Sequence, residues 1–260
     1  MIDTRLDLPV REAAPRRRGL TMVIDPGLFT AQFADAVESV GEYVDMVKFG
    51  WCTALVTRDV KRKIDILREA GIDFYFGGTL FERFAVDGMV ADWCDLCRTM
   101  GVTHVEVSNG TIPMSNAEKS SWVARLSDEF TVVSEVGFKE RERAADMSSA
   151  EWVDAIGLDL AAGASLVITE ARESGSSGLC NADGTPRADV VDDVLNCGVD
   201  VDRLLFEAPT KDLQCFFVKR LGASVNLGNV RADDVIALET LRLGLRSDTM
   251  MAPESGWEVR

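Results

Sequence analysis

Eight short apolar runs alternate with eight amphipathic segments along this 260-residue chain, and this alternation restricts the fold more than any other feature. The runs are rich in Val, Ile, Leu and Phe, which is typical of strands buried on both faces of a parallel sheet. The predicted strands cover residues 20–25, 44–49, 73–77, 103–108, 131–136, 165–171, 203–208 and 223–227. The predicted helices cover residues 29–40, 57–70, 86–100, 115–128, 149–162, 187–196, 210–221 and 232–246. Eight strand–helix units of about 30 residues each predict an α/β fold, a single-domain (β/α)8 TIM barrel.

A doubly wound open sheet is the alternative architecture, but it usually has fewer strands or an interruption of the alternation. The glycine-containing segments 77–78 and 175–178 do not match the GxGxxG pattern of dinucleotide-binding folds. We therefore expect a barrel over residues 19–249, preceded by an N-terminal arm over residues 1–18 that is mobile or docked on a partner. Residues 250–260 are expected to form a C-terminal tail.

The net charge of −15 argues against nucleic acid and anionic membranes as partners, because like charges repel. No apolar run approaches 20 residues, so no membrane-spanning helix is predicted. Among six cysteines only Cys94 and Cys97 have the spacing of metal ligands, which favours reduced thiols in a cytoplasmic protein over a zinc site. An anionic small molecule would need a local positive pocket or a divalent cation to bind this chain.

Charged side chains stand at the ends of the predicted strands, where TIM-barrel enzymes carry their catalytic residues. The end of the sixth strand has the highest density of such residues, with Glu170, Arg172, Glu173 and Ser174 within five positions. The other strand ends carry Asp25, Lys48, Thr79, Glu106, Ser108, Asn109, Glu135, Glu207, Asn226 and Asn229, with Lys139 and Lys211 a few residues further on. Such charges are costly unless they are paired or bound to a metal or ligand. Salt bridges inside the barrel are one interpretation, and an active site is the other, which the repetition favours.

These residue types fit one kind of chemistry. Carboxylates bind Mg²⁺, which prefers oxygen ligands and can neutralise a substrate carboxylate or enolate. A nearby lysine can donate or remove a proton at carbon, and the planar guanidinium of Arg172 suits a phosphate or a carboxylate. Backbone N–H groups in the loops after the sixth and eighth strands also suit a phosphate. The sequence therefore indicates a Mg²⁺-assisted enzyme that acts on a small anionic substrate.

Several uncommon strings resemble the phosphosulfolactate synthase family. They include VKFGWCT at residues 47–53 and EARESG at residues 170–175, and others lie at residues 19–28, 77–82, 106–110, 134–137, 206–209, 225–229 and 243–249. The resemblance implies a TIM barrel and a carbon–sulfur lyase that uses Mg²⁺ to add sulfite to phosphoenolpyruvate. The product would be phosphosulfolactate, a precursor in coenzyme M biosynthesis.

The resemblance also implies roles for individual residues. Lys139 is expected to protonate the carbon next to the substrate carboxylate, with Glu135 and Lys48 as further catalytic residues. Mg²⁺ ligands are expected among Asp25, Glu106, Glu170 and Glu207. Substrate contacts are expected from Arg172, Ser174, Lys211, Asn226, Gly228, Asn229 and Arg246. Barrels of this kind often associate, so a homo-oligomer is expected.

Five positions depart from the family pattern. The family commonly has lysine where Pro26 and Phe138 stand, aspartate at Asn109, glycine at Cys52 and glutamine at Leu213. Two fewer lysines weaken the attraction for substrates as anionic as phosphoenolpyruvate and sulfite. Three alternatives therefore stay open: an enzyme that adds a different nucleophile to an enolpyruvyl or related acid in a specialised pathway, a Schiff-base aldolase using Lys139 or Lys48, and a non-catalytic family member.

Overall fold

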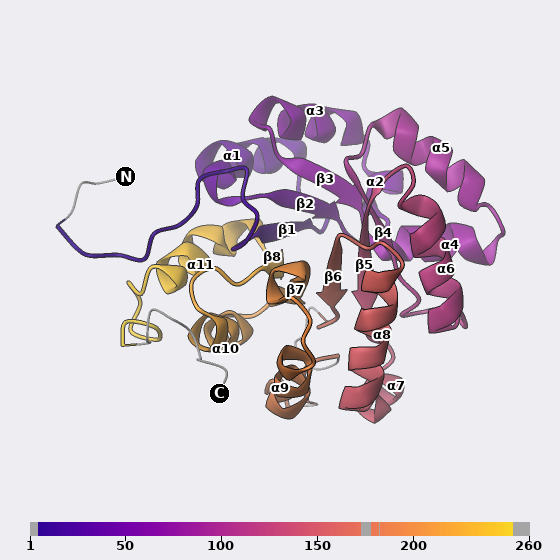
Figure 1. Ribbon diagram of the computed structural model, residues 1–260. Coiled ribbons are helices and arrows are strands. Elements are labelled where there is room, and N and C mark those ends of the chain that lie inside the picture. The colour runs from indigo at the N-terminus through magenta and orange to yellow at the C-terminus, as the bar shows by residue number, and fades with distance from the viewer. Residues whose placement is uncertain (1–4, 173–177, 182, 252–260) are drawn as a thin grey trace.

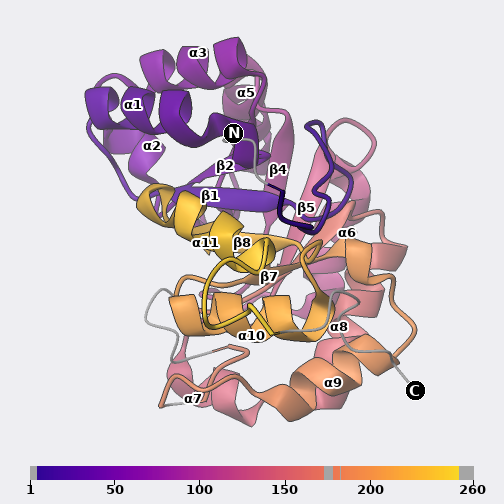
Figure 2. The ribbon, with the colours of Figure 1, turned by 90° about the vertical axis from the view of Figure 1, so that its left-hand side faces the viewer.

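The computed structural model describes residues 5–172, 178–181 and 183–251, apart from the side chain of Arg141. Eight parallel strands form a nearly closed barrel surrounded by helices (Figure 1; Figure 2 is turned by 90°), which confirms the predicted TIM-barrel fold. The strands are β1 (Thr21–Asp25), β2 (Met46–Phe49), β3 (Asp73–Phe76), β4 (His104–Val107), β5 (Thr131–Val136), β6 (Leu166–Thr169), β7 (Leu204–Glu207) and β8 (Leu227–Val230).

The strands are joined by backbone hydrogen bonds in the order β3-β2-β1-β8-β7-β6-β5-β4, so β3 and β4 are the end strands of the sheet. Within the described residues these two strands share no regular ladder. The Thr103 N–H donates to the Phe74 carbonyl at 3.3 Å, and the Thr103 hydroxyl accepts from the Phe74 N–H at 3.3 Å. We call this junction the β3–β4 seam.

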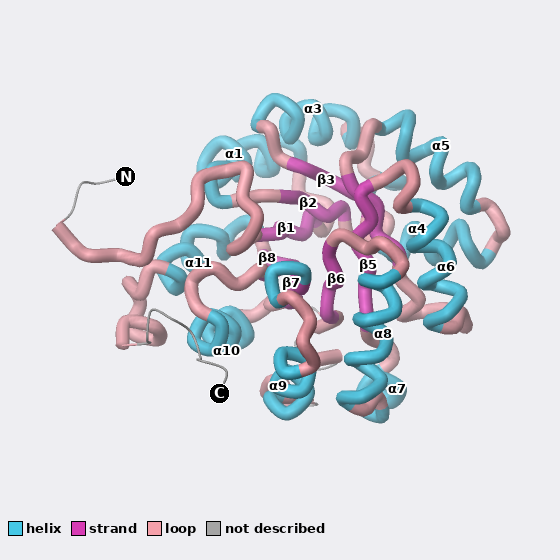
Figure 3. The backbone as a smooth tube through the Cα atoms, in the orientation of Figure 1, coloured by secondary structure: helices cyan, strands magenta, loops and turns pink. Residues whose placement is uncertain are grey.

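Eleven α-helices lie outside the strands (Figure 3) in the described part of the chain. They are α1 (Thr30–Val40), α2 (Thr53–Val56), α3 (Val60–Ala70), α4 (Gly78–Val86), α5 (Val90–Met100), α6 (Asn116–Leu126), α7 (Arg141–Asp146), α8 (Ser149–Ala161), α9 (Ala188–Asn196), α10 (Lys211–Leu221) and α11 (Val235–Arg242). Three 3-10 turns, η1 (Gly41–Tyr43), η2 (Val201–Arg203) and η3 (Ala232–Asp234), complete the described elements. Ser115 and Ser148 begin α6 and α8 with capping boxes that include Glu118 and Glu151, and Gly71 and Gly101 end α3 and α5 in the left-handed conformation.

The helix α4 was not predicted, because no helix was expected between the end of the third strand at residue 77 and residue 86. A Cβ atom on Gly78 would lie 2.3 Å from the Ser108 hydroxyl and 2.7 Å from the Glu106 carboxylate. The glycine therefore permits close contact with β4, and the chain continues from it into a helix. The short helices α2 and α7 were also not predicted.

The eighth strand begins at Leu227, where the predicted strand ended. The preceding residue, Asn226, uses its side chain to accept from the Leu20 N–H at 2.9 Å and to donate to the Leu204 carbonyl at 3.0 Å. Gly228 and Asn229 resemble a turn in the sequence but lie inside the strand. A Cβ atom on Gly228 would lie 2.2 Å from the Leu205 side chain, so the crowded barrel interior requires glycine there.

Apolar side chains fill the lower half of the barrel and leave the upper half to charged residues. The apolar plug consists of Leu20, Met22, Met46, Tyr75, Val133, Ile168 and Leu205. Because side chains alternate along a strand, the residue two positions after a plug residue also faces inward. This rule directs Lys48, Glu135, Glu170 and Glu207 into the barrel above the plug.

The described part of the N-terminal arm contacts the barrel through two arginines. Arg11 pairs with Glu239 at 3.0 Å, and Arg16 pairs with Asp45 at 3.2 Å, with both arginine side chains below 10 % exposed. The arm protrudes on the left in Figure 1 and toward the viewer in Figure 2. Among the described helices, none combines the length and the apolar character needed to cross a bilayer.

Candidate active site at the carboxyl ends of the strands

A cavity of about 600 Å³ opens at the carboxyl ends of the strands, above the plug. Its charged lining residues are Lys48, Glu106, Glu135, Lys139, Glu170, Arg172, Glu207 and Arg231. The four glutamates are between 1 % and 3 % exposed, so their charges are removed from water almost completely. Burial on this scale is stable only with partners or ligands, which makes the cavity the candidate active site.

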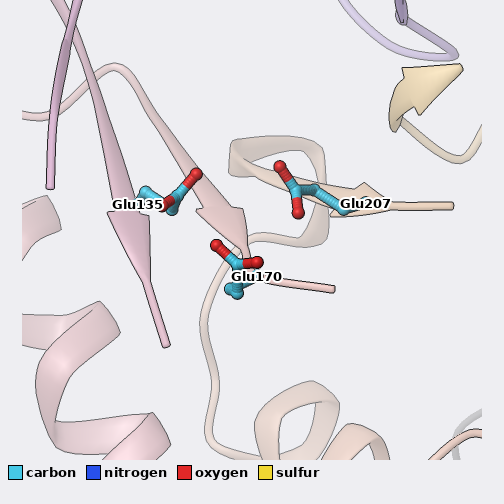
Figure 4. Close-up of side chains that lie close together, drawn as sticks. All are labelled: Glu135, Glu170 and Glu207. Atoms are coloured by element: carbon cyan, nitrogen blue, oxygen red, sulfur yellow. The ribbon is translucent and has the colours of Figure 1, made fainter. Parts of the chain in front are cut away.

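Three of the glutamates form a compact cluster. Glu135, Glu170 and Glu207 each offer a carboxylate oxygen, and these oxygens lie within 4.8 Å of one another. The side chains come from the ends of β5, β6 and β7 and point toward one another (Figure 4). Glu170 Oε2 is buried and has no hydrogen-bond partner among the described residues. An oxygen-lined site with an unused buried acceptor fits a hard divalent cation such as Mg²⁺.

Lys48 supplies a positive charge beside this cluster. Its Nζ atom lies 3.0 Å from Glu207 Oε1, 3.5 Å from Glu106 Oε2 and 3.6 Å from Glu135 Oε2. Burial alone would lower the pKa of Lys48, but the surrounding carboxylates raise it well above its ordinary value. The ammonium group therefore stays charged, and internal salt bridges coexist with the proposed cation site.

Lys139 lies at the mouth of the cavity, after β5. Its Nζ atom donates to the Thr79 hydroxyl at 3.1 Å and lies 3.4 Å from Glu135 Oε1. Burial alone would lower the pKa of Lys139, but Glu135, Glu170 and other carboxylates raise it above its usual value. The side chain is 25 % exposed, so a charged ammonium group is available both to the cavity and to solvent.

The carboxyl groups differ in charge although they lie together. Burial would raise the pKa of Glu135, but Lys139 and Lys48 lower it to about 2. Burial, reinforced by the charges of Glu135 and Glu207, raises the pKa of Glu170 well above its usual range. Glu135 and Glu170 are hydrogen-bonded to each other, and this contact contributes to both shifts by lowering the pKa of Glu135 and raising that of Glu170.

Two of the predicted metal ligands lie outside this cluster. Glu106 faces the cavity, but its Oε1 accepts from the Gly78 N–H at 2.5 Å and its Oε2 lies near Lys48. Asp25 faces the helices instead, because alternation along β1 directs Ile24 inward. Lys63 of α3 pairs with Asp25 Oδ2 at 2.6 Å, so Asp25 belongs to the outer core.

The predicted substrate contacts are divided among several places. Arg172 and Asn229 line the cavity, whereas Ser174 lies outside the described residues. Lys211 and Arg246 lie outside the barrel, where both pair with Asp248. Asn226 precedes β8 at the opposite end of the barrel, and Gly228 occupies the crowded interior.

Among the cavity residues that were not predicted are Trp51, Thr111 and Arg231, whereas Thr79 was noted as the residue at the end of the third strand. Arg231 follows β8 directly and would have been expected if the end of that strand had been placed correctly. Trp51 is 53 % exposed and has a positive φ of 50°, which is unusual for a large side chain and is common at functional sites. Thr111 carries no signal of its own in the sequence.

The positions that depart from the family pattern lie in different parts of the structure, and only some of them line the cavity. Pro26 lines the cavity. Asn109 instead donates to the Met114 carbonyl at 2.8 Å and to Asn116 Oδ1 at 3.0 Å, which fixes the loop after β4. Phe138 packs under the guanidinium of Arg143, which lies 4.0 Å from the ring centre.

Comparison with known proteins shows the family to which the chain belongs. The family described as ComA, (2R)-phospho-3-sulfolactate synthase, matches residues 9–248. A phosphosulfolactate synthase of Bacillus subtilis (strain 168) is 49% identical over 249 residues, covering 96% of this chain and 99% of that protein. Another, from Methanothermobacter thermautotrophicus, is 40% identical over 246 residues, covering 93% of this chain and 95% of that protein.

A solved structure shares the fold without close sequence similarity. A crystal structure of 3-hexulose-6-phosphate synthase superposes with a TM-score of 0.53 at 15% identity, covering 84% of this chain and 98% of that one. This likeness supports the barrel alone. The family match and the two close relatives decide the identity: the chain belongs to the phosphosulfolactate synthase family.

Proposed function

We propose that the protein is a Mg²⁺-dependent carbon–sulfur lyase that adds sulfite to phosphoenolpyruvate and forms (2R)-phosphosulfolactate. One observation carries the proposal: three buried glutamates, Glu135, Glu170 and Glu207, meet beside Lys48 and Lys139 in one cavity. The names of the close relatives support the same activity.

The three clustered glutamates are the residues that would hold Mg²⁺. Their oxygens lie within 4.8 Å of one another, and Glu170 Oε2 has no described hydrogen-bond partner. Bound there, Mg²⁺ would withdraw negative charge from the carboxylate of phosphoenolpyruvate. Burial raises the pKa of both Glu207 and Glu135, and Lys48, which contacts both carboxylates, opposes this rise.

The reaction needs one new bond and one proton. The sulfur lone pair of sulfite forms a bond to the methylene carbon, and the electrons of the carbon–carbon double bond move to the neighbouring carbon. The Lys139 ammonium then donates a proton to that carbon and recovers one from solvent. Thr79 orients the ammonium group at 3.1 Å, and the raised pKa of Lys139 keeps it charged until the proton is needed.

Two guanidinium groups at the rim suit the phosphate of the substrate. Arg172 follows β6 and Arg231 follows β8, and both line the cavity. Arg231 is held by Asp233 through two hydrogen bonds of 3.0 Å, which fixes the plane of its guanidinium. Lys139 lines the same cavity, so a substrate whose phosphate binds these arginines would share the cavity with the proposed proton donor.

The alternatives differ in how well the cavity fits them. A Schiff-base aldolase needs an uncharged amine, whereas the carboxylates raise the pKa of both Lys48 and Lys139. A different nucleophile is favoured by Pro26 alone, because this residue lines the cavity where the family commonly has lysine.

The test is an assay with phosphoenolpyruvate, sulfite and Mg²⁺, read by mass spectrometry and by phosphorus NMR. Phosphosulfolactate should form only when all three are present, and a chelator should stop its formation. Turnover with another nucleophile but not with sulfite would reject the proposed substrate, and product formation in chelator would reject the role of Mg²⁺.

A further inference from the structure

A second group of buried charges lies behind the active site, between β5 and the helices that cover it. Lys119 of α6 pairs with Asp159 Oδ2 of α8 at 2.7 Å, and both side chains are almost completely buried. The Ser134 hydroxyl, on the outer face of β5, donates to the same oxygen. None of the three lines the cavity.

This group is connected to the active site through the backbone. The Lys119 ammonium also donates to the carbonyl oxygen of Glu135 at 2.8 Å. The paired register of β4 and β5 ends at Val107 and Ser134, one residue before Glu135. Lys119 therefore supports the strand where the neighbouring strand β4 has ended.

The residues that follow depend on the same support. The Glu135 side chain points into the cavity and contacts Lys48 and Lys139. Beyond it, Gly137 has a φ of 127°, and a Cβ atom there would lie 2.6 Å from Glu170. The end of β5 is thus closely packed on the cavity side and hydrogen-bonded to an ammonium group on the helix side, so Glu135 has little freedom to move.

Stability alone does not explain this arrangement. A buried ion pair is usually no more stabilising than well-packed apolar residues of the same volume. An ammonium group can do what an apolar side chain cannot, which is to donate a directed hydrogen bond to a chosen carbonyl. Groups that orient metal ligands in this way typically change metal affinity about 10- to 100-fold when they are removed.

We propose that Lys119, fixed by Asp159 and Ser134, is a positioning residue that holds the end of β5 so that Glu135 meets Glu170 and Glu207 and Lys139 reaches the substrate. The inference rests on the proposed function, since it assigns the role of Glu135 in the cation site. The three residues concerned, Lys119, Asp159 and Ser134, lie on α6, α8 and β5, and none of them lines the cavity.

The experiment measures Mg²⁺ binding by calorimetry, which does not depend on turnover. The main variant is Lys119→Met/Asp159→Asn, because it removes the ammonium group without leaving a buried charge unpaired and keeps an acceptor for Ser134. We expect Mg²⁺ affinity to fall about tenfold or more, and kcat to fall while the KM for sulfite changes less.

The matched control is Lys63→Met/Asp25→Asn, which alters the other buried Lys–Asp pair of the outer shell. Lys63 and Asp25 pair at 2.6 Å behind β1, a strand that carries none of the four cavity glutamates. This variant should keep its Mg²⁺ affinity.

The outcomes separate the inference from the proposed function. Absence of Mg²⁺ binding in the unmodified protein rejects the cation site and the positioning role with it. Normal binding and kcat in the folded Lys119→Met/Asp159→Asn variant reject the positioning role alone, as does an equal loss in the control. If the double variant does not fold, Lys119→Arg decides: a directed donor of another shape should retain affinity, and loss of affinity in that folded variant contradicts the proposal.

Discussion

Replacement of Lys48 by methionine tests whether this ammonium group allows the buried glutamates to remain charged. Lys48 is 5 % exposed, and its Nζ atom lies within 3.6 Å of three carboxylates. Methionine retains most of the side-chain volume, so packing changes little and the charge is the main loss. The substitution therefore isolates the electrostatic contribution.

The magnitude follows from two considerations. Removal of one partner from a buried ion pair costs about 3–5 kcal/mol. A buried carboxylate that loses the neighbouring lysine can become neutral by binding a proton. This protonation costs about 1.4 kcal/mol for each unit by which the pH exceeds the ordinary pKa of the carboxylate. For a glutamate with an ordinary pKa of 4.5, the cost is limited to about 5 kcal/mol near pH 8 and to about 1.4 kcal/mol near pH 5.5.

The assay is unfolding in urea, followed by tryptophan fluorescence in the presence of a chelator. We expect the free energy of unfolding of Lys48→Met to be lower by about 4 kcal/mol near pH 8 and by about 1–2 kcal/mol near pH 5.5. Saturating Mg²⁺ should raise the free energy of unfolding of the variant above its own value in chelator, because a ligand at 100 times its Kd stabilises the folded state by about 2.7 kcal/mol.

Lys63→Met is the matched control. It breaks a buried pair of 2.6 Å with Asp25 outside the cavity. Mg²⁺ should therefore stabilise this variant by the same amount as the unmodified protein, and its loss of stability relative to that protein should be the same in chelator and in Mg²⁺. A loss below about 1 kcal/mol for Lys48→Met near pH 8, or an equal loss at both pH values, would refute the reasoning.

Four further substitutions test other parts of the site. Lys139→Ala should lower kcat by about 10²- to 10⁴-fold with an unchanged circular dichroism spectrum, and near-normal kcat would exclude it as the proton donor. Glu170→Gln should raise the Mg²⁺ concentration needed for half-maximal activity, and an unchanged titration would remove Glu170 from the cation site. Burial raises the pKa of Glu106 from 4.5 to about 7, so the folded state binds its proton more tightly and stability falls as pH rises through this interval. Glu106→Gln should flatten that dependence in chelator, and an identical slope would contradict the shift. Cys52→Gly should stabilise the protein by about 1 kcal/mol, because Cys52 has a positive φ of 57°; a lower melting temperature would show that the conformation is not strained.

The sequence predicted the barrel well because its strands are marked by physical properties that act locally. Apolar runs bounded by helical segments identified all eight strands, and seven of them lie where they were expected. The inward direction of Glu135, Glu170 and Glu207 follows from alternation behind Val133, Ile168 and Leu205. Those glutamates could therefore be recognised without coordinates.

Other features depend on contacts between distant segments and could not be predicted in this way. Asp25 was assigned to the cation site because it ends a strand, but its face is set by Met22 and Ile24, which turn inward. Arg231 was overlooked because Gly228 and Asn229 resemble a turn, and only crowding by Leu205 explains a glycine inside that strand. The hydrogen bond from the Lys119 side chain to the Glu135 carbonyl joins residues 16 positions apart, and no pattern in the sequence predicts it.

At the β3–β4 seam, two cavity residues also have a structural role. Glu106 of β4 accepts from the Gly78 N–H just after β3, and Lys139 donates to the neighbouring Thr79. These contacts fasten the two edges of the curled sheet where a backbone ladder is lacking in the described residues. Glu106 and Lys139 therefore help to hold the barrel closed as well as lining the active site. Hydrogen exchange of the backbone amides of Phe74 and Thr103, which lie at the seam, should report on the state of the active site.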